Sequence, residues 1–542
     1  MAEEAEVHAA EEEAADSTTP DANNQSNQIH IKSKKKMKRL TNIALMLIMA
    51  LGTYAQSTYD AINFFNPDLV GTARFVGMGG SMSALGGDIS TMSTNPAGIG
   101  IYRSNDVAVS ASLNLLNTKA DFLGSVVERD NTQLSFDNFG LVLAGYCGEG
   151  TLRYLNLGLN ISHRNNFRKD FAMNGWYADG DFSQQYQMQS LYDQSLPDLE
   201  NINCYSYMNP RYPWLPLLAY DAGIIDATGG INYLPTDATY YSEERGGTYQ
   251  VDCNLSCNIN DRLYLGMTIG VQSIDYKRYS IYSEYDDVGV IYDLENNFKT
   301  EGEATEIKFG AILRPFEYSP FRMGLAFHLP TYYSLTDYSS AYIAGPSDEN
   351  GKYKEMATNW ESAYGEDYIV DYTVRSPWRM NVSAGYTFDN FIALNAEYEL
   401  VDYSSAKMEY QDGPEMPDMN EEFRSNMKCS HIFRLGAEMR LDDNLSMRCG
   451  YNYISSAFED DAWKYISPSS ACTATEYTNT AETNIFSLGL GYHDKSIYFD
   501  AAYQCMLQNA EFYPYVDPEL QIPATDVSLM RNKLVLTIGA RF

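Results

Sequence analysis

The sequence predicts an all-β protein: a membrane β-barrel of about 14 antiparallel strands. Three observations carry this prediction. From residue 106 onward, apolar residues alternate with polar or small residues in one segment after another. Short connections alternate with long ones between these segments. The last segment ends on the aromatic residue Phe542, as the final strands of bacterial barrels commonly do.

The alternation is clearest at residues 155–162, where leucine or isoleucine at every odd position is separated by asparagine, glycine or serine. Such a segment has one apolar face, which in a barrel faces lipid. The runs meet or exceed the roughly 9–11 residues that a tilted membrane-spanning strand needs. The predicted strands lie near 106–117, 131–146, 152–166, 247–259, 262–282, 304–314, 320–335, 368–388, 391–404, 429–441, 445–455, 484–493, 496–506 and 531–542.

The connections separate into two kinds. Tight turns are predicted at Cys147–Gly150, Asn260–Asp261, Asp389–Asn390, Asp442–Asn444 and Asp494–Lys495. Long connections are predicted at 167–246, 283–303, 336–367, 405–428, 456–483 and 507–530. Alternation of this kind is typical of outer-membrane barrels, with short periplasmic turns and long extracellular loops. A soluble β-sandwich, the alternative, has no reason to segregate its loops in this way.

The composition excludes other classes of protein. The chain has 542 residues, 38 Lys+Arg against 72 Asp+Glu, a formal net charge of −34 and a mean hydropathy of −0.36. This polar average argues against a multi-span helical membrane protein, whereas a barrel stays polar because only every second residue faces lipid. The charge repels phosphate backbones, so no nucleic-acid partner is expected. The 44 tyrosines suit β-structure better than helix.

The N-terminus resembles a secretory leader. Residues 1–36 are acidic and lack apolar periodicity, which indicates a disordered or non-native extension. Lysines around Met37, the apolar run 40–51 and a small-residue site ending at Ala55 predict a signal peptide over residues 37–55. A transmembrane anchor is the alternative, but the apolar run is too short to span a bilayer.

Residues 56–105 are Gly-rich and lack strand alternation. They contain Gly77-Met78-Gly79-Gly80, Ala84-Leu85-Gly86-Gly87-Asp88 and Asn95-Pro96-Ala97-Gly98. With the predicted strands over residues 106–542, these motifs resemble the FadL/OmpP1/TodX family of outer-membrane transporters of hydrophobic compounds. The resemblance implies that residues 56–105 form an N-terminal hatch inside the lumen of a fourteen-stranded barrel. The alternative for Asn95-Pro96-Ala97-Gly98 is an ordinary turn before the first strand.

The resemblance also implies a function and a location. A protein of this family takes up hydrophobic molecules such as long-chain fatty acids passively across the bacterial outer membrane. The ligand displaces the hatch and leaves sideways near the third strand, here about 152–166, where no proline marks a kink. Two alternatives remain: an accessory outer-membrane barrel of a protein secretion system, which binds cargo proteins, and a haemin uptake receptor.

One long loop contains an apolar segment that could capture a ligand. An exposed apolar patch often marks a ligand or partner contact. The alternative is that this loop, about 80 residues long, needs a small core of its own. The residues of this segment are Trp214, Leu215, Leu217, Leu218 and Tyr220.

Charged residues of both signs occupy predicted lumen-facing positions. Because a tight turn is predicted at 442–444, Glu438 and Arg448 should lie opposite each other on neighbouring strands. A structural ladder of charges is one interpretation. A polar ligand contact, such as a fatty-acid carboxylate at Arg434 or Arg440, is the other.

No catalytic constellation is visible. His163, His328, His431 and His493 are isolated on predicted strands, without a Ser/His/Asp or metal-spaced cluster, so neither enzyme activity, a metal nor a cofactor is predicted. The expected partners are outer-membrane lipid and lipopolysaccharide, a hydrophobic small-molecule ligand, the barrel assembly machinery through the C-terminal strand and, in the secretion alternative, a secreted protein.

Overall fold

The computed structural model describes residues 57–176, 182–195, 212–346, 356–358, 368–389, 391–411, 413–467, 470–516 and 522–542. The chain divides into two compact units, residues 1–51 and 52–542, and the described residues all belong to the second. The predicted extension and signal peptide lie outside the described residues and stay predictions.

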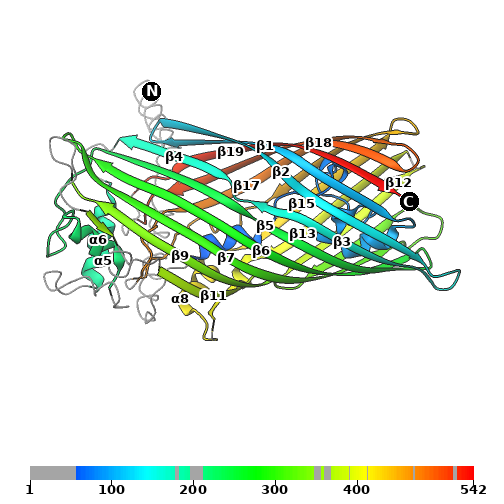
Figure 1. The fold of residues 1–542 in the computed structure, drawn as a ribbon, viewed down its shortest axis with the longest axis horizontal. Coiled ribbons are helices and arrows are strands. Elements are labelled where there is room, and N and C mark those ends of the chain that lie inside the picture. The colour runs from blue at the N-terminus through cyan, green and yellow to red at the C-terminus, as the bar shows by residue number, and fades with distance from the viewer. Residues whose placement is uncertain are drawn as a thin grey trace, which may run out of the picture. The chain divides into compact units, whose positions relative to one another are not determined.

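The described strands form one closed antiparallel sheet, in which the first strand pairs with the last (Figure 1). Four barrel strands are interrupted and appear as the pairs β3/β4, β8/β9, β11/β12 and β13/β14, and the three-residue β10 pairs with β9. The barrel therefore has 14 strands, which confirms the predicted fold class. The strands are β1 (Asp106–Phe122), β2 (Ser125–Tyr146), β3 (Leu152–Asn166), β4 (Lys169–Trp176), β5 (Asp237–Ile259), β6 (Leu263–Tyr285), β7 (Val290–Leu313), β8 (Arg322–His328), β9 (Tyr332–Ala344), β10 (Met356–Thr358), β11 (Tyr368–Arg375), β12 (Arg379–Phe388), β13 (Ile392–Asp402), β14 (Lys407–Tyr410), β15 (Cys429–Arg440), β16 (Leu445–Ile454), β17 (Tyr477–His493), β18 (Ile497–Tyr513) and β19 (Thr525–Arg541).

Two predicted features of the connections are wrong. A long connection was predicted over 283–303, but β6 and β7 continue through most of it and turn at Asp286–Gly289. The first two strands are also longer than predicted and meet in a two-residue turn, Leu123–Gly124, with both residues at positive φ. Polar residues interrupt the apolar alternation in these outer strand halves, so the sequence pattern did not predict them. A strand that extends beyond lipid needs no apolar face.

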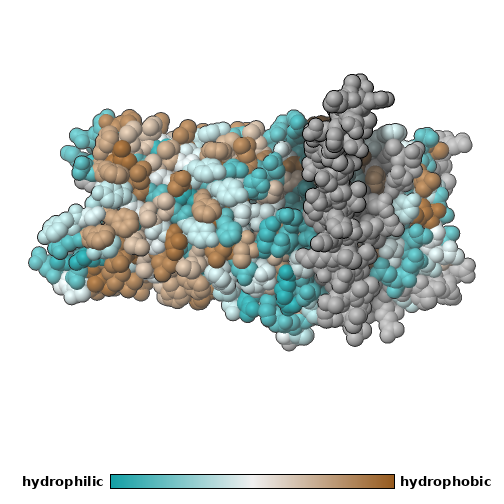
Figure 2. All heavy atoms as spheres, turned by 180° about the vertical axis from the view of Figure 1, so that it is seen from behind, coloured by the Kyte–Doolittle hydropathy of each residue, from teal (hydrophilic) through white to brown (hydrophobic). Residues whose placement is uncertain are grey.

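The alternation of side chains explains which face of each strand meets lipid. Leu155, Leu157 and Ile161 of β3 are exposed on the outside, whereas Asn156 and Asn160 are buried in the lumen. Figure 2 shows hydrophobic side chains gathered over the part of the barrel away from the long-loop helices. This apolar band is the lipid-facing surface of the barrel.

Short helices occupy the lumen and the loops. They are α3 (Thr58–Phe65), α4 (Ala73–Gly77), η1 (Ile89–Ser93), η2 (Pro96–Ile101), α5 (Gln184–Ser195), α6 (Trp214–Asp221), η6 (Tyr403–Ser405) and α8 (Pro417–Asn426). Ser57 caps α3 by accepting a hydrogen bond from the Tyr59 N–H, and Asn95 caps η2 in the same way. Among the described residues, every helix is too short or too polar to cross a membrane.

Candidate functional site

Residues 71–101, called the floor below, pack against the inner wall of the barrel. The predicted hatch motif lies at its centre, with Asn95 and Ala97 fully buried. Asn95 Nδ2 donates to Ser83 O at 2.8 Å, and Asn95 Oδ1 accepts from the Ala97 N–H at 3.1 Å. The Pro96 carbonyl accepts hydrogen bonds from Asn254 Nδ2 at 3.2 Å and Ser256 Oγ at 2.8 Å, both on β5. The motif therefore joins the floor to the wall.

Glycines of the wall make room for the floor. A Cβ atom at Gly310 of β7 would overlap Asn95 Oδ1, and one at Gly266 of β6 would overlap the Pro96 backbone. On the far wall, a Cβ atom at Gly450 of β16 would overlap the Gly79 backbone. The floor thus approaches the wall backbone to backbone, which requires residues without side chains. The isolated glycines in these strands were a signal that the sequence interpretation missed.

The predicted lumen charges form ion pairs with one another. Glu438 lies opposite Arg448 in the β15–β16 register, as predicted, and Arg448 Nε is 2.6 Å from Glu438 Oε2. Arg74 of the floor binds the same carboxylate at 2.8 Å, and Arg448 also contacts Asp500 at 2.5 Å. These contacts tie the floor to three wall strands by charge.

Arg434 is paired in the same manner. Its Nη1 atom lies 2.8 Å from Glu399 and 3.7 Å from Glu397. Arg440 lies apart from this network, exposed at the end of β15. The contacts of Arg434 and Arg448 fit the structural ladder, and ligand binding at Arg434 or Arg440 stays a prediction.

The apolar loop segment is buried. Trp214, Leu215, Leu217 and Leu218 of α6 are at most 2% exposed, and Tyr220 is half-buried against the same cluster. They pack with α5 and with the ends of β4–β7, β9, β18 and β19 (Figure 1). An exposed patch is therefore absent at α6: the segment lies in a core, as in the alternative, but the loop shares this core with the strand ends. A role of these side chains in ligand capture stays a prediction.

A cavity of about 430 Å³ lies beside α3 and the residues that connect α3 to the floor. Asn66–Val70 forms this connection, called the linker below, and its residues are exposed or half-buried. Nine Lys or Arg and seven Asp or Glu side chains line the cavity. The cavity is therefore richer in bases than in acids, the reverse of the whole chain.

Beside this cavity, backbone pairing in the barrel wall is interrupted along a line that is called the seam below. The seam separates the N-terminal half of β2 from the end of β3 and from β4. Backbone pairing of β2 with β3 stops at Asn138–Ser162, and among the described residues β4 pairs only with β5. Side chains bridge the seam instead. The contacts are Ser135 Oγ to His163 Nδ1 at 2.9 Å, Asn166 Nδ2 to Gln133 Oε1 at 2.8 Å, Asn131 Nδ2 to Asp170 Oδ2 at 2.8 Å, and Ser125 Oγ to Asn174 Oδ1 at 2.5 Å.

The seam begins at the level of the apolar band and continues beyond it. Leu134, which is 77% exposed, and Phe136 flank its first bridge, at Ser135. The third barrel strand is broken at Phe167–Arg168 without a proline. A sequence feature beside this break lies on the neighbouring strand, β5. There Gly246 has φ of +102°, and a Cβ atom would overlap the Asp275 carbonyl. A glycine inside a strand often marks the close approach of another backbone, and this signal was also missed.

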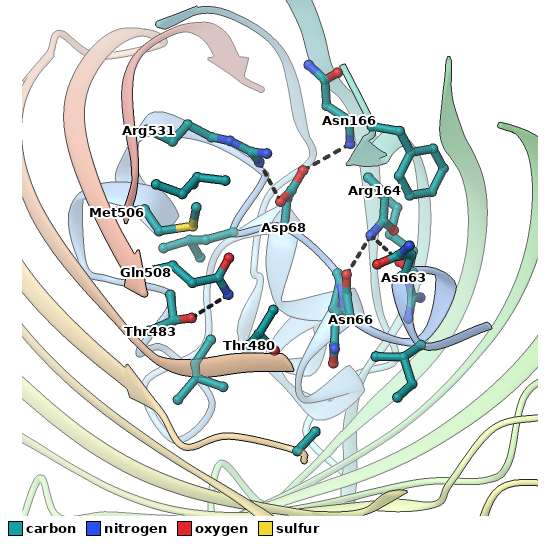
Figure 3. A pocket seen from close by; sticks show the side chains of 18 of the residues that line it. Asn63, Asn66, Asp68, Arg164, Asn166, Thr480, Thr483, Met506, Gln508 and Arg531 are labelled. Atoms are coloured by element: carbon teal, nitrogen blue, oxygen red, sulfur yellow. Dashed lines mark hydrogen bonds and ion pairs between the residues drawn. The ribbon is translucent and has the colours of Figure 1, made fainter. Parts of the chain in front are cut away.

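The linker runs beside the end of β3, with Asp68 next to Asn166 (Figure 3). The Asp68 N–H donates to Arg164 O at 3.1 Å, and Asn165 Nδ2 donates to Asn66 O at 2.5 Å. The Asp68 carboxylate accepts from the Asn166 N–H at 2.9 Å and from Arg531 Nη1 at 2.7 Å. The linker therefore occupies the edge of β3 that β2 leaves unpaired. In the described part of the chain, the side chains include no group of three His, Cys, Asp or Glu that could hold a metal ion.

No family model and no curated protein matches the chain. Among solved structures, the crystal structure of a Pseudomonas aeruginosa FadL homologue matches with a TM-score of 0.50 and 12% sequence identity, over 88% of this chain and 99% of that chain. This chain has the FadL fold. The toluene transporters TbuX of Ralstonia pickettii, at 13% identity, and TodX of Pseudomonas putida, at 11% identity, also match. Each has a TM-score of 0.46 and covers 88% of this chain and 99% of its own.

The FadL-type barrel places the chain in the bacterial outer membrane, as predicted. Its apolar band matches the lipid-facing surface of such barrels. The FadL homologue supports the fold of this chain.

Proposed function

We propose that this barrel carries hydrophobic molecules such as long-chain fatty acids passively across the outer membrane, and that they leave sideways through the seam. One observation carries the proposal: the cavity lies between the floor and a wall whose backbone pairing stops beside it, at Asn138–Ser162. In this proposal the floor, which contacts the wall closely at several glycines, closes the straight route to the periplasm. Sideways exit spares an apolar molecule from crossing these polar contacts.

The seam suits an opening because of how it is held. Unpaired backbone groups in hydrocarbon each cost several kcal/mol, so a barrel wall is normally paired along its length. Here four side-chain hydrogen bonds replace the backbone ladder, and each contributes only about 0.5–1.5 kcal/mol. Parting β2 from the end of β3 and from β4 therefore breaks few strong contacts, while residues 138–146 of β2 stay paired with β3.

Uptake of radiolabelled hexadecanoate by cells with and without the gene tests the transport. Cysteines at Gln133 and Asn166, joined by a short thiol cross-linker, test the route. We expect the gene to raise uptake and the cross-link to abolish the increase. A matched control pairs cysteines at Asn117 and Met530, which are in register on the continuous β1–β19 ladder, and should leave uptake unchanged.

Each result has a distinct meaning. Equal uptake with and without the gene would reject transport, and a secreted protein that then co-purifies with the barrel would support the secretion alternative. Gene-dependent uptake that survives the Gln133–Asn166 cross-link would reject only the lateral route.

A further inference from the structure

The Asp68 carboxylate occupies a ready-made anion site between two wall strands. Arg531 Nη1 of β19 is 2.7 Å from Asp68 Oδ1, and the Asn166 backbone N–H at the end of β3 donates to Asp68 Oδ2 at 2.9 Å (Figure 3). A guanidinium group and a backbone amide that converge on one carboxylate form a strong, charge-assisted site. Asp68 comes from the linker, so the anion in this site is supplied by a segment that belongs to neither strand.

The site opens onto the cavity. The Arg531 side chain is 17% exposed and that of Asp68 is 27% exposed, and both residues line the cavity. Lys533 lies two residues along β19 on the same face, where it pairs with Asp137 at 3.0 Å. In a chain with 72 acids and 38 bases, this cavity has more bases than acids. The local excess of bases favours an anion here.

Apolar side chains lie next to the same site. Met506 of β18 points into the cavity beside Arg531 in Figure 3, and Leu69, Val527 and Leu529 also line the cavity. A molecule with its charge at Arg531 would thus have apolar surface for an attached chain. Charged and apolar surfaces side by side are suited to an amphiphile.

We infer that the Arg531–Asn166 site binds the anionic headgroup of an alkyl-chain amphiphile in place of Asp68, and that this exchange releases the linker from the seam. The inference rests on the proposed function and specifies the class of substrate that opens the seam. An anion can replace Asp68 without leaving the Arg531 charge unpaired, which a neutral headgroup cannot do. Asp68 acts as an internal competitor for the site.

The experiment measures binding of three ligands to the purified full chain in non-ionic detergent: hexadecanoate, hexadecyl phosphate and hexadecanol. The variants are Arg531→Gln, Arg531→Lys and Asp68→Asn. The control is Arg541→Gln, on the same strand, which removes a similar pair with Asp106 at the other end of the barrel. The two anions separate a carboxylate-specific site from a general anion site.

We expect Arg531→Gln to weaken hexadecanoate binding about tenfold, the equivalent of one charge-assisted hydrogen bond, and to leave hexadecanol unchanged. Arg531→Lys should retain part of the affinity because it keeps the charge. Asp68→Asn should tighten hexadecanoate binding, because the competitor loses its charge. Arg541→Gln should change neither ligand.

Two results would overturn the inference. If Arg531→Gln and Asp68→Asn change hexadecanoate and hexadecanol binding equally, or change neither, the headgroup does not bind at Arg531, and the proposed transport function still stands. If the wild-type chain binds none of the three ligands, the proposed function fails together with the inference. If both anions bind alike and both depend on Arg531, the site recognises anionic headgroups in general.

Discussion

The floor and the linker are consecutive parts of one segment in the lumen, but they are held in different ways. The floor meets the wall at glycines such as Gly266 and Gly310, and its Arg74 shares the half-buried carboxylate of Glu438 with the buried Arg448. The linker reaches the wall through a few hydrogen bonds, and its main ion pair, Asp68–Arg531, is partly exposed to the cavity. The two ion pairs are about equally exposed, so the difference lies in the close backbone contacts of the floor and in the three hydrogen bonds from two arginines to Glu438.

This difference indicates which part of the segment moves. The resemblance to the FadL/OmpP1/TodX family implies that the ligand displaces the hatch. The contacts of the floor make its displacement costly, whereas release of the linker alone would clear the lumen side of the seam. We therefore expect the floor to stay in place during transport while the linker moves.

The largest effect should come from breaking the charge network of the floor. Glu438→Ala removes three charge-assisted hydrogen bonds, two from Arg74 and one from Arg448, which should lower the free energy of unfolding by about 3–5 kcal/mol. Urea unfolding in detergent micelles, followed by tryptophan fluorescence, measures this loss. Glu415→Ala, which breaks the exposed pair with Lys407, is the control and should cost under about 1 kcal/mol. Equal losses would contradict a strongly held floor.

The next effect is a pH dependence on the side of α3, the helix that precedes the linker. Burial raises the pKa of Glu422 in α8 from 4.5 to about 7, and Phe423 of the same helix packs on Phe65 of α3. Between these two pKa values the folded chain holds a proton that the unfolded chain has lost. Stability is thus greatest below pH 4.5 for this group and falls by about 3 kcal/mol as the pH rises through 7.

The Glu422→Gln variant should flatten this pH dependence. Urea midpoints of the wild type and the variant at pH 5 and pH 8 measure the change. If the midpoint of the wild type rises with pH while that of the variant does not, the sign assigned to Glu422 is wrong.

A smaller effect should come from adding one methyl group under the hatch motif. Gly310→Ala places a Cβ atom on Asn95 Oδ1, and overpacking of this kind typically costs about 1–3 kcal/mol. Gly150→Ala, at a turn with open space around the Cβ position, is the matched control. The heat-induced gel shift of the folded barrel reports both. Equal behaviour of the two variants would show that the floor is loosely seated.

The smallest global effect should come from the linker. Asp68→Asn breaks an ion pair with an arginine, as Glu438→Ala does, but Asp68 accepts one hydrogen bond from an arginine where Glu438 accepts three, so the loss in the free energy of unfolding should be about 1 kcal/mol. Hydrogen exchange at residues 66–70 should nevertheless increase, while exchange in the floor stays unchanged. Increased exchange in both regions would mean that the floor and the linker move as one body.

The sequence supported the barrel well because its signal is local. Alternation at 155–161 and the turn at 442–444 were sufficient to predict a strand and the opposition of Glu438 and Arg448. The outer strand halves escaped prediction because they leave the lipid and lose their apolar face. The apolar segment at Trp214 had two interpretations, because an exposed ligand-binding patch and a buried core are both built from apolar residues. Its burial depended on the ends of strands that are distant in the sequence.

A barrel strand in lipid must pair its backbone and alternate its side chains. The sequence alone therefore determined the strand pattern, the closing strand and the acidic, polar average composition. The floor, the seam and the Asp68 site arise only when the barrel closes. Arg531, Asn166 and Asp68 are far apart in the chain or belong to different elements, and their meeting depends on the stagger of the strands around the barrel. Local alternation records which way a side chain points, but not which residue it meets across the lumen.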